Sequence, residues 1–443
     1  MRSIAGWVCL ASLTVAAGCT PERPPLPPDV IPPEREAKIH RSFDRARAAM
    51  QAEDAAGSWS EKRCREVAAS FAEVAHDLSN ADPVGSRAAL FDQGLALSRC
   101  KLHDEAAKIF ETIVAADPEH HEAQVRVALH RYQAQGRPFL NEAIERLVAA
   151  VRASQFKSAN ALVALAVLQM ERSGSAPDAD GDGDLERAGK NLRRALAVDD
   201  GFMPAFNQLA LFYLHGAKLR AGRGGEGHLT LAGEQRPAVD VATLELAALV
   251  CSQALQKDPS YAPIHNTAGL VDAELGRLSA AARAFARARA LDPRLFEAHM
   301  NYAAVNLQFR GFVEAEAAYR DAVKLQPKSY DARLGLALAQ RGRLSSNPDE
   351  AALAEVEKTL AEAKALAPDR PEAYFNQAIL VQEFRARGPE LRAKLQEADR
   401  LHADFREKAS ERPELRNAVA RSSERSEDIA KILEFLPRDG ATQ

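Results

Sequence analysis

The sequence is poor in aromatic residues and has almost no net charge. Aromatic side chains make up 6% of the 443 residues, whereas 46% are hydrophobic, with many alanines among them. This composition disfavours a β-rich core and favours stacked helices. The 58 basic and 62 acidic residues are mixed along the chain and leave a net charge of −4. Because no basic stripe stands out, nucleic acid is not an expected partner.

Motifs of the common enzyme classes are also missing. The sequence contains no His-Glu-x-x-His, Gly-x-Ser-x-Gly or Walker A motif. Residues Gly222 to Gly227 satisfy Gly-x-Gly-x-x-Gly, but no strand precedes them and no βαβ unit surrounds them, as a nucleotide site requires. We therefore expect neither an enzyme nor a small-molecule substrate, and we expect no cofactor apart from the calcium ion considered below.

The apolar run from Ile4 to Ala17 is too short for a permanent membrane span and has the length of a signal peptide. It ends in the residues VAAGC, which resemble a bacterial lipoprotein signal. The resemblance implies cleavage after residue 18 and acylation of Cys19. Because Thr20 and not Asp follows the cysteine, it also implies sorting to the outer membrane, on the periplasmic face. An ordinary secretory signal with an incidental cysteine is the alternative.

Residues 20–33 contain seven prolines. Such a segment cannot fold and adopts an extended, semi-rigid conformation. Together with Cys19 it is expected to act as a tether, residues 19–33, that holds the folded part off the membrane. A proline-rich ligand for a partner protein is the other interpretation.

Residues 262–329 repeat with a period of 34, marked by Pro259, Pro293 and Pro327. Small residues and one aromatic residue recur at the same places in both periods. Numbered from Ala262, these are Gly269 and Ala303 at position 8, Ala281 and Ala315 at position 20, Phe285 and Tyr319 at position 24, and Ala288 and Ala322 at position 27. The small residues let two helices pack closely, and proline ends the second helix. The pattern resembles the tetratricopeptide repeat (TPR).

The resemblance implies an all-α, TPR-type helix-turn-helix solenoid with about nine helix pairs and C-terminal capping helices. The expected segments are a signal peptide at 1–18, a degenerate helix pair at 34–80, a solenoid at 87–388 and charged capping helices with a tail at 389–443. Two insertions are expected in the solenoid, near 173–184 and 215–239.

In TPR proteins the first helix of each pair lines the concave face through positions 2, 5, 9, 12 and 13. Carried over to this chain, these positions hold many apolar residues, which suggests a groove for an elongated protein partner. The candidate groove residues are Phe91, Leu95, Val125, Leu129, Tyr132, Leu211, Leu214, Leu270, Met300, Leu307, Leu334, Leu338, Phe375 and Ile379. The family's clamp for carboxylate-terminated peptides is missing. Burial of part of this row by the superhelix or the terminal cap is the alternative.

An acidic segment at 178–186 resembles the start of an EF-hand calcium loop, with oxygen ligands at alternate positions. The candidate calcium ligands are Asp178, Asp180, Asp182, Asp184 and Glu186. The twelfth place, where a bidentate Glu belongs, is Gly189. A solvated acidic loop, in which Asp184 caps the following helix, is the alternative.

Besides Cys19, three cysteines remain after signal cleavage, in a compartment that permits disulfides. Cys64 opens the second helix of the first pair, and Cys100 closes the first helix of the next. Because these helices should pack antiparallel, both cysteines come to the same end, which predicts a Cys64–Cys100 disulfide. Cys251 is expected to be a buried small hydrophobic residue.

Together these features predict a lipid-anchored periplasmic scaffold that binds envelope proteins or peptides in its groove. In layout the chain looks most like TPR lipoproteins of the myxobacterial gliding-motility complex. Two alternatives stay open: an adaptor for cell-wall hydrolases, and a lipoprotein of the pilotin or barrel-assembly type.

Overall fold

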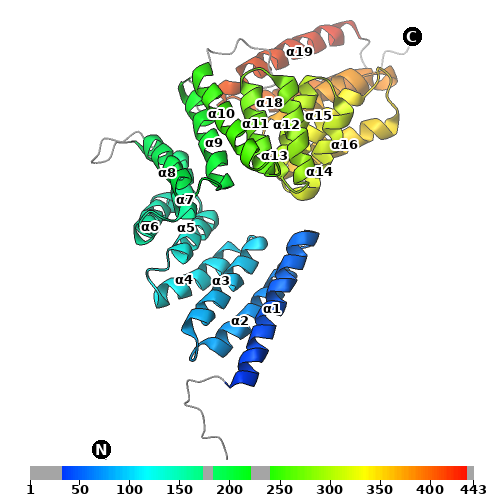
Figure 1. Ribbon diagram of the computed structural model, residues 1–443. Coiled ribbons are helices and arrows are strands. Elements are labelled where there is room, and N and C mark those ends of the chain that lie inside the picture. The colour runs from blue at the N-terminus through cyan, green and yellow to red at the C-terminus, as the bar shows by residue number, and fades with distance from the viewer. Residues whose placement is uncertain (1–31, 173–182, 221–239, 437–443) are drawn as a thin grey trace, which may run out of the picture. The chain divides into compact units, whose positions relative to one another are not determined.

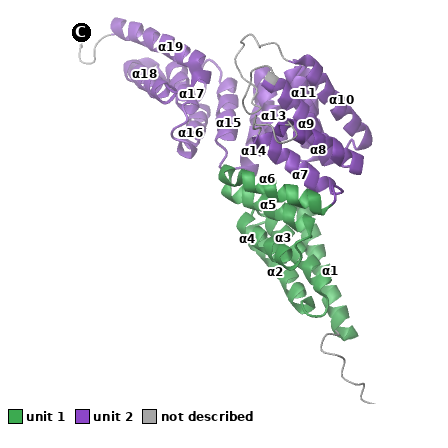
Figure 2. Ribbon diagram, turned by 90° about the vertical axis from the view of Figure 1, so that its left-hand side faces the viewer, with its two compact units in different colours: residues 1–154 green, residues 155–443 purple. Residues whose placement is uncertain are grey.

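The computed structural model describes residues 32–172, 183–220 and 240–436. Within these ranges the chain forms nineteen α-helices and no β-strand, which confirms the all-α prediction. No helix there is both long enough and apolar enough to cross a membrane. The chain divides into two compact units, residues 1–154 and 155–443, and each is described by itself (Figure 2).

The described part of unit 1 consists of three helix pairs, in which each helix packs against the next. The helices are α1 (Pro33–Ala56), α2 (Glu61–Leu78), α3 (Pro83–Arg99), α4 (His103–Ala116), α5 (His121–Gln135) and α6 (Leu140–Ala153), with a 3₁₀ turn (Arg137–Phe139) before α6.

The described part of unit 2 consists of six further pairs and one final helix (Figure 1). The helices are α7 (Ala159–Arg172), α8 (Asp184–Val198), α9 (Met203–Arg220), α10 (Val241–Lys257), α11 (Ala262–Glu274), α12 (Leu278–Leu291), α13 (Phe296–Gln308), α14 (Phe312–Leu325), α15 (Tyr330–Arg343), α16 (Glu350–Leu366), α17 (Glu372–Leu380), α18 (Leu391–Lys408) and α19 (Arg416–Phe435). A π-helical turn (Val381–Arg385) continues α17.

Side-chain caps set the start of several helices. Ser60, Asp82, Asp240 and Asp349 each accept a hydrogen bond from the backbone N–H three residues ahead, at the starts of α2, α3, α10 and α16. A cap of this kind satisfies one of the N–H groups that a helix leaves unpaired in its first turn. The local sequence therefore determines where these four helices begin.

The 34-residue period appears directly in the helix boundaries. α11 and α13 start at Ala262 and Phe296, and α12 and α14 start at Leu278 and Phe312, so that both intervals equal the sequence period. Within each pair the second helix packs against the first. The two regular repeats therefore have equal helix offsets, as the TPR resemblance implies.

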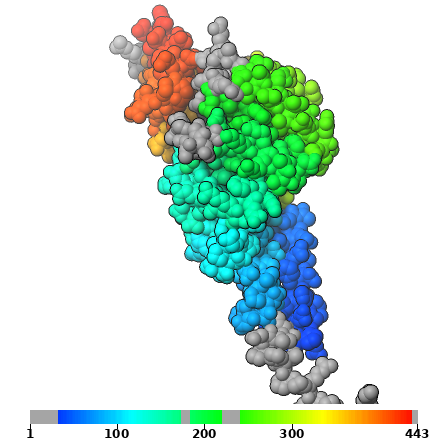
Figure 3. Space-filling view, turned by 60° about the vertical axis from the view of Figure 1, so that its left-hand side comes forward, coloured from blue at the N-terminus to red at the C-terminus, as the bar shows by residue number. Residues whose placement is uncertain are grey.

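Close packing explains the residue types at positions 8 and 24. A β-carbon placed on Gly269 would lie 2.5 Å from the ring of Phe285, and one on Gly94 would lie 2.5 Å from the ring of Phe110. Both phenylalanines are fully buried. Glycine at position 8 thus makes room for the aromatic ring of the partner helix. The space-filling view shows the green part of the chain, which includes residues 203–220 and 241–257, as a closely packed surface (Figure 3).

In unit 1, Cys64 near the start of α2 and Cys100 just after α3 form a disulfide. This is the pair that the sequence predicts. Cys251 is a free and buried cysteine on α10, in unit 2. Burial raises the pKa of its thiol to about 12, so it is an inert packing residue at neutral pH.

The sequence interpretation places the start of the second insertion too early, at residue 215. α9 continues to Arg220, so residues 215–220 are helical. Ala217 is buried in a cluster with Leu244 of α10, and Lys218 forms an ion pair with Glu274 of α11 at 3.1 Å. These contacts carry the helix past Gly216. Residues 221–239 and 173–182, the cores of the two expected insertions, lie outside the described residues.

Residues 389–443, which the sequence interpretation assigns to a cap, contain one helix of a further pair and one capping helix among the described residues. α18 packs against α17 as the second helix of a ninth pair, and α19 in turn packs against α18. Leu395 and Ala398 of α18 form a buried cluster with Val381 and with Ile429 of α19. Only α19 therefore remains as a cap beyond the helix pairs in the described part of the chain.

Candidate partner groove

In unit 2 the first helices of successive pairs lie side by side. α9 contacts α7 and α11, and contacts of the same kind join α11 to α13, α13 to α15 and α15 to α17. We call this the first-helix layer of unit 2. It is the layer that the TPR resemblance assigns to the concave, partner-binding face.

Polar side chains join neighbouring helices within this layer. The hydrogen bonds run from Thr267 Oγ1 to Asn207 Oδ1 (2.7 Å), from Asn301 Nδ2 to Asn266 Oδ1 (3.0 Å) and from Arg341 Nη1 to Asn376 Oδ1 (2.8 Å). We call these six residues the polar ladder. Each bond crosses from one repeat to the next, so the ladder fixes how adjacent first helices sit against one another.

The sequence interpretation missed the polar ladder because it selected apolar residues only. A signal was present: Asn207 and Asn266 both fall at position 5 of their repeats, a position that faces the groove in TPR proteins. Asn207, Asn266 and Asn376 are 9% exposed and Thr267 is 2% exposed, so the ladder serves the packing between repeats. Burial lowers the pKa of Arg341, the one cation of the ladder.

In unit 1 the predicted groove residues lie on α3 and α5 and are largely packed. Phe91 lies 5.3 Å from the ring of Phe110 and 5.8 Å from that of His120 (centroid distances). Val125 is fully buried. The half-buried members of the row are Phe91, Leu95, Leu129 and Tyr132.

In unit 2 the predicted groove residues lie on α9, α11, α13, α15 and α17. Leu214 and Ile379 are buried. The half-buried members are Leu211, Leu270, Met300, Leu307, Leu334, Leu338 and Phe375. All fourteen predicted groove residues are therefore at least partly covered. They can form the walls of a groove, and binding of a partner there stays a prediction.

The C-terminal helices cover the row at its end. The ring of Phe375 lies 4.8 Å from that of Phe405 and 5.9 Å from that of His402, both on α18. Because α18 is the second helix of the ninth pair, these contacts are packing within that pair and do not test the alternative that a terminal cap buries part of the row. The half-buried part of the unit 2 row thus extends from α9 to α17.

In the structure Asp184 is an ion-pair residue, and its role as a calcium ligand stays a prediction. Its side chain is 3% exposed, and its two carboxylate oxygens accept hydrogen bonds of 2.6 Å from Arg172 and of 2.8 Å from Arg187. These guanidinium groups occupy the oxygens that a calcium ion would need. Asp184 does not cap α8 either, because Gly183 stands at the N-cap.

The other candidate ligands leave the calcium prediction open. Glu186 is exposed on the first turn of α8. Asp178, Asp180 and Asp182 lie outside the described residues, as does the lipidation candidate Cys19. In the part of the chain that the structure describes, no group of three or more His, Cys, Asp or Glu side chains is placed to hold a metal ion.

Comparison with known families and proteins adds only a likeness of fold. No family model matches the chain, and no curated protein matches it. Among solved structures, a thermophilic TPR protein of Thermus thermophilus is similar at 24% identity over 49% of this chain and 98% of that chain, with a TM-score of 0.39.

Two other solved structures are similar over longer stretches. A tetratricopeptide repeat protein of Parabacteroides merdae has 13% identity over 68% of this chain and 98% of its own, with a TM-score of 0.39. PilW, described as a widely conserved type IV pilus biogenesis factor, has 15% identity over 59% of this chain and 98% of its own, with a TM-score of 0.40. The repeat period and the packing described above make the chain an all-α solenoid of the TPR type.

Proposed function

We propose that the protein is a scaffold that binds an extended segment of another protein along the first-helix layer of unit 2. The observation that carries this proposal is the continuity of the layer from α7 to α17 together with its polar ladder. The half-buried apolar side chains of this layer can contact the apolar side chains of an extended segment, and the polar ladder holds the first helices in register beneath it.

We further propose that Cys19 anchors this scaffold to the outer membrane, with its partner in the periplasm. Several acyl chains on one cysteine make anchoring stable, where a single chain does not. The partner is then an envelope protein, and a component of a gliding-motility machinery is the candidate that the layout favours. A cell-wall hydrolase, or a client of a pilotin or barrel-assembly lipoprotein, is the alternative partner.

A photo-crosslinking residue tests the binding surface. With p-benzoylphenylalanine at Met300 or Leu338, both half-buried in the first-helix layer, ultraviolet light applied to intact cells should produce one crosslinked species of higher mass. The physical reason is proximity, because the reagent reacts only with groups in direct contact. Mass spectrometry of the adduct then separates motility components from hydrolases and from barrel components.

The matched controls lie on the second helices. Arg287 of α12 and Ala317 of α14 are exposed and tolerate the same residue without loss of packing. They should give no adduct. Equal crosslinking at these outer positions, or none in the first-helix layer, would contradict the proposal.

The anchor has its own test. Cells fed an alkyne fatty acid should label the full protein, and Cys19→Ala should abolish the label because no other residue receives the acyl chains under the lipoprotein resemblance. Cys251→Ala should keep it, since that thiol is buried. Label that persists in Cys19→Ala, or that is missing from the unaltered protein, would remove the anchor from the proposal.

A further inference from the structure

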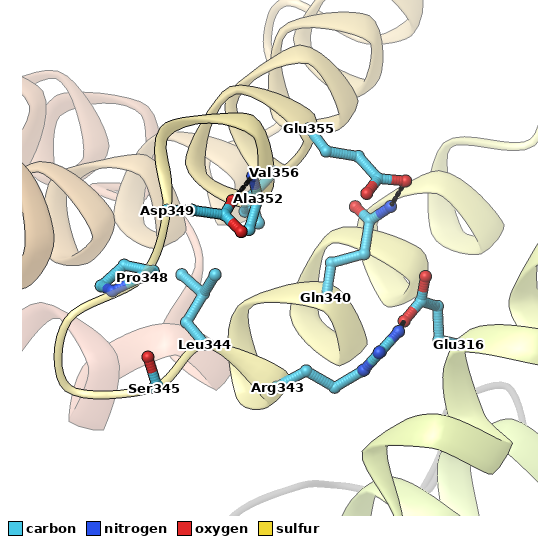
Figure 4. A pocket seen from close by; sticks show the side chains of 10 residues that line it. All are labelled: Glu316, Gln340, Arg343, Leu344, Ser345, Pro348, Asp349, Ala352, Glu355 and Val356. Carbon is cyan, nitrogen blue, oxygen red and sulfur yellow. Dashed lines mark hydrogen bonds and ion pairs between the residues drawn. The ribbon is translucent and has the colours of Figure 1, made fainter.

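The turn that joins α15 to α16 borders a pocket of about 260 Å³ at the C-terminal end of α15 (Figure 4). Its lining comes from α14, from the end of α15, from the turn and from the first two turns of α16. The residues used below are Glu316, Gln340, Arg343, Asp349, Glu355 and Val356. The pocket exists because this repeat has a longer turn between its two helices than the regular repeats have.

Gln340 places an unpaired acceptor at this pocket. Its side chain is 6% exposed, and its Nε2 donates a 3.0 Å hydrogen bond to Glu355 Oε1. Because a carboxylate accepts only, this bond fixes the orientation of the amide. Gln340 Oε1 is buried and has no hydrogen-bond partner among the described residues. Figure 4 shows this oxygen on the side of the amide toward Asp349. A buried acceptor without a donor costs free energy, so a ligand that donates a hydrogen bond to this oxygen would be stabilised here.

The charges around the pocket favour a cation as that donor. Glu316 is 5% exposed and accepts hydrogen bonds from Arg320 and Arg343. Burial alone would raise the pKa of Glu316, but these two bonds outweigh it and lower the pKa. Arg320 also pairs with Glu355 at 2.5 Å. Both guanidinium groups are thus engaged by carboxylates and offer little to an anion.

Two further features of the pocket also favour a cation. Asp349 Oδ1 accepts a 2.7 Å hydrogen bond from Ala352 N and so caps α16. Its carboxylate is the third one in the lining of the pocket. α15 ends at Arg343, so the negative end of its dipole also lies at the pocket. Three carboxylates, the C-terminus of α15 and the side chain of Gln340 therefore line the same pocket.

We propose that this pocket binds an alkylammonium group, the chemistry of a lysine side chain. An ammonium is compact and carries three N–H donors, and Gln340, Asp349 and Glu355 offer acceptors on different sides of the pocket. Leu344 and Val356 form apolar walls against which a methylene chain can pack. None of the predicted groove residues or polar-ladder residues lines the pocket, so the function proposed above does not depend on it.

The test uses the full chain with methyl-labelled leucine and valine. In titrations with n-butylammonium chloride, the methyl signals of Leu344 and Val356 should shift and saturate in the millimolar range, as expected for so small a ligand. The neutral n-pentanol, similar in shape, should give no saturable shift. n-Butylguanidinium should bind more weakly, and tighter binding of the guanidinium would overturn the assignment to an ammonium.

Two variants make the test specific. Gln340→Met keeps the size of the side chain and removes the acceptor, and the affinity for n-butylammonium should fall about tenfold. Asp349→Asn keeps a good helix cap and removes one charge, and the affinity should fall about fivefold. Gln208→Met on α9 is the matched control and should leave it unchanged. Unaltered affinity in Gln340→Met would show that Gln340 does not bind the ammonium, and no saturable shift in the starting protein would show that the pocket does not bind it; either result would overturn the proposal.

Discussion

Replacing both Cys64 and Cys100 with alanine should lower the free energy of unfolding of unit 1 by about 4 kcal/mol. The disulfide joins two residues that are 36 positions apart, from the start of α2 to the end of α3. Such a cross-link restricts the unfolded chain, so its removal stabilises the unfolded state. Urea denaturation followed by tryptophan fluorescence measures the loss.

The chain offers a local probe and a matched control. Trp59 lies between α1 and α2, and its Nε1 donates a 2.9 Å hydrogen bond to Asp54, so its emission reports on unit 1. Cys251→Ala removes the free thiol of unit 2 and should leave the Trp59 transition where it is. A reductant should destabilise the unaltered protein as the double variant does. A Trp59 transition that keeps its midpoint without the disulfide would show this expectation to be wrong.

Asp184→Ala should cost unit 2 about 3 kcal/mol. The substitution removes a carboxylate that is 3% exposed. Arg172 and Arg187, whose side chains are 31% and 22% exposed, then lose their hydrogen bonds to it. A buried carboxylate with several hydrogen bonds contributes more than a surface pair, because its removal leaves the donors around it less well satisfied. Loss of helical circular dichroism in urea gives the measurement.

Glu186→Ala is the control for Asp184→Ala, because Glu186 is exposed on the same helical turn. Its effect should stay within about 0.5 kcal/mol. Both experiments are repeated with calcium and with a chelator. If Asp184 is a structural ion-pair residue, its loss costs the same in both conditions. A cost that appears only with calcium would restore Asp184 as a ligand.

The helical parts of the fold were readable from local patterns. The spacing of Pro259, Pro293 and Pro327 predicts helix pairs with a period of 34, and the helices from Ala262 onward start at that interval. The Cys64–Cys100 pairing followed from counting helix ends, since antiparallel neighbours bring the end of one helix to the start of the other. These features depend on few residues and on short distances along the chain.

Contacts between distant residues account for what the sequence interpretation missed. The end of α9 depends on the Lys218–Glu274 ion pair, and the polar ladder joins residues as far apart as Asn207 and Thr267. Asp184 looked like a calcium ligand because its neighbours in sequence are acidic, whereas its partner Arg172 lies on the preceding helix. No local pattern reveals which side chains meet across such a separation.

By itself the sequence determined the repeat unit, because small residues, one aromatic residue and a proline at constant intervals admit only tightly paired helices. The tertiary structure alone decided which of the groove positions remain accessible and which polar groups occupy them. Leu214 and Ile379, for example, are buried at positions that the repeat pattern assigns to the groove. The physical reason is that burial is a property of all neighbouring elements together, whereas periodicity is a property of each helix pair.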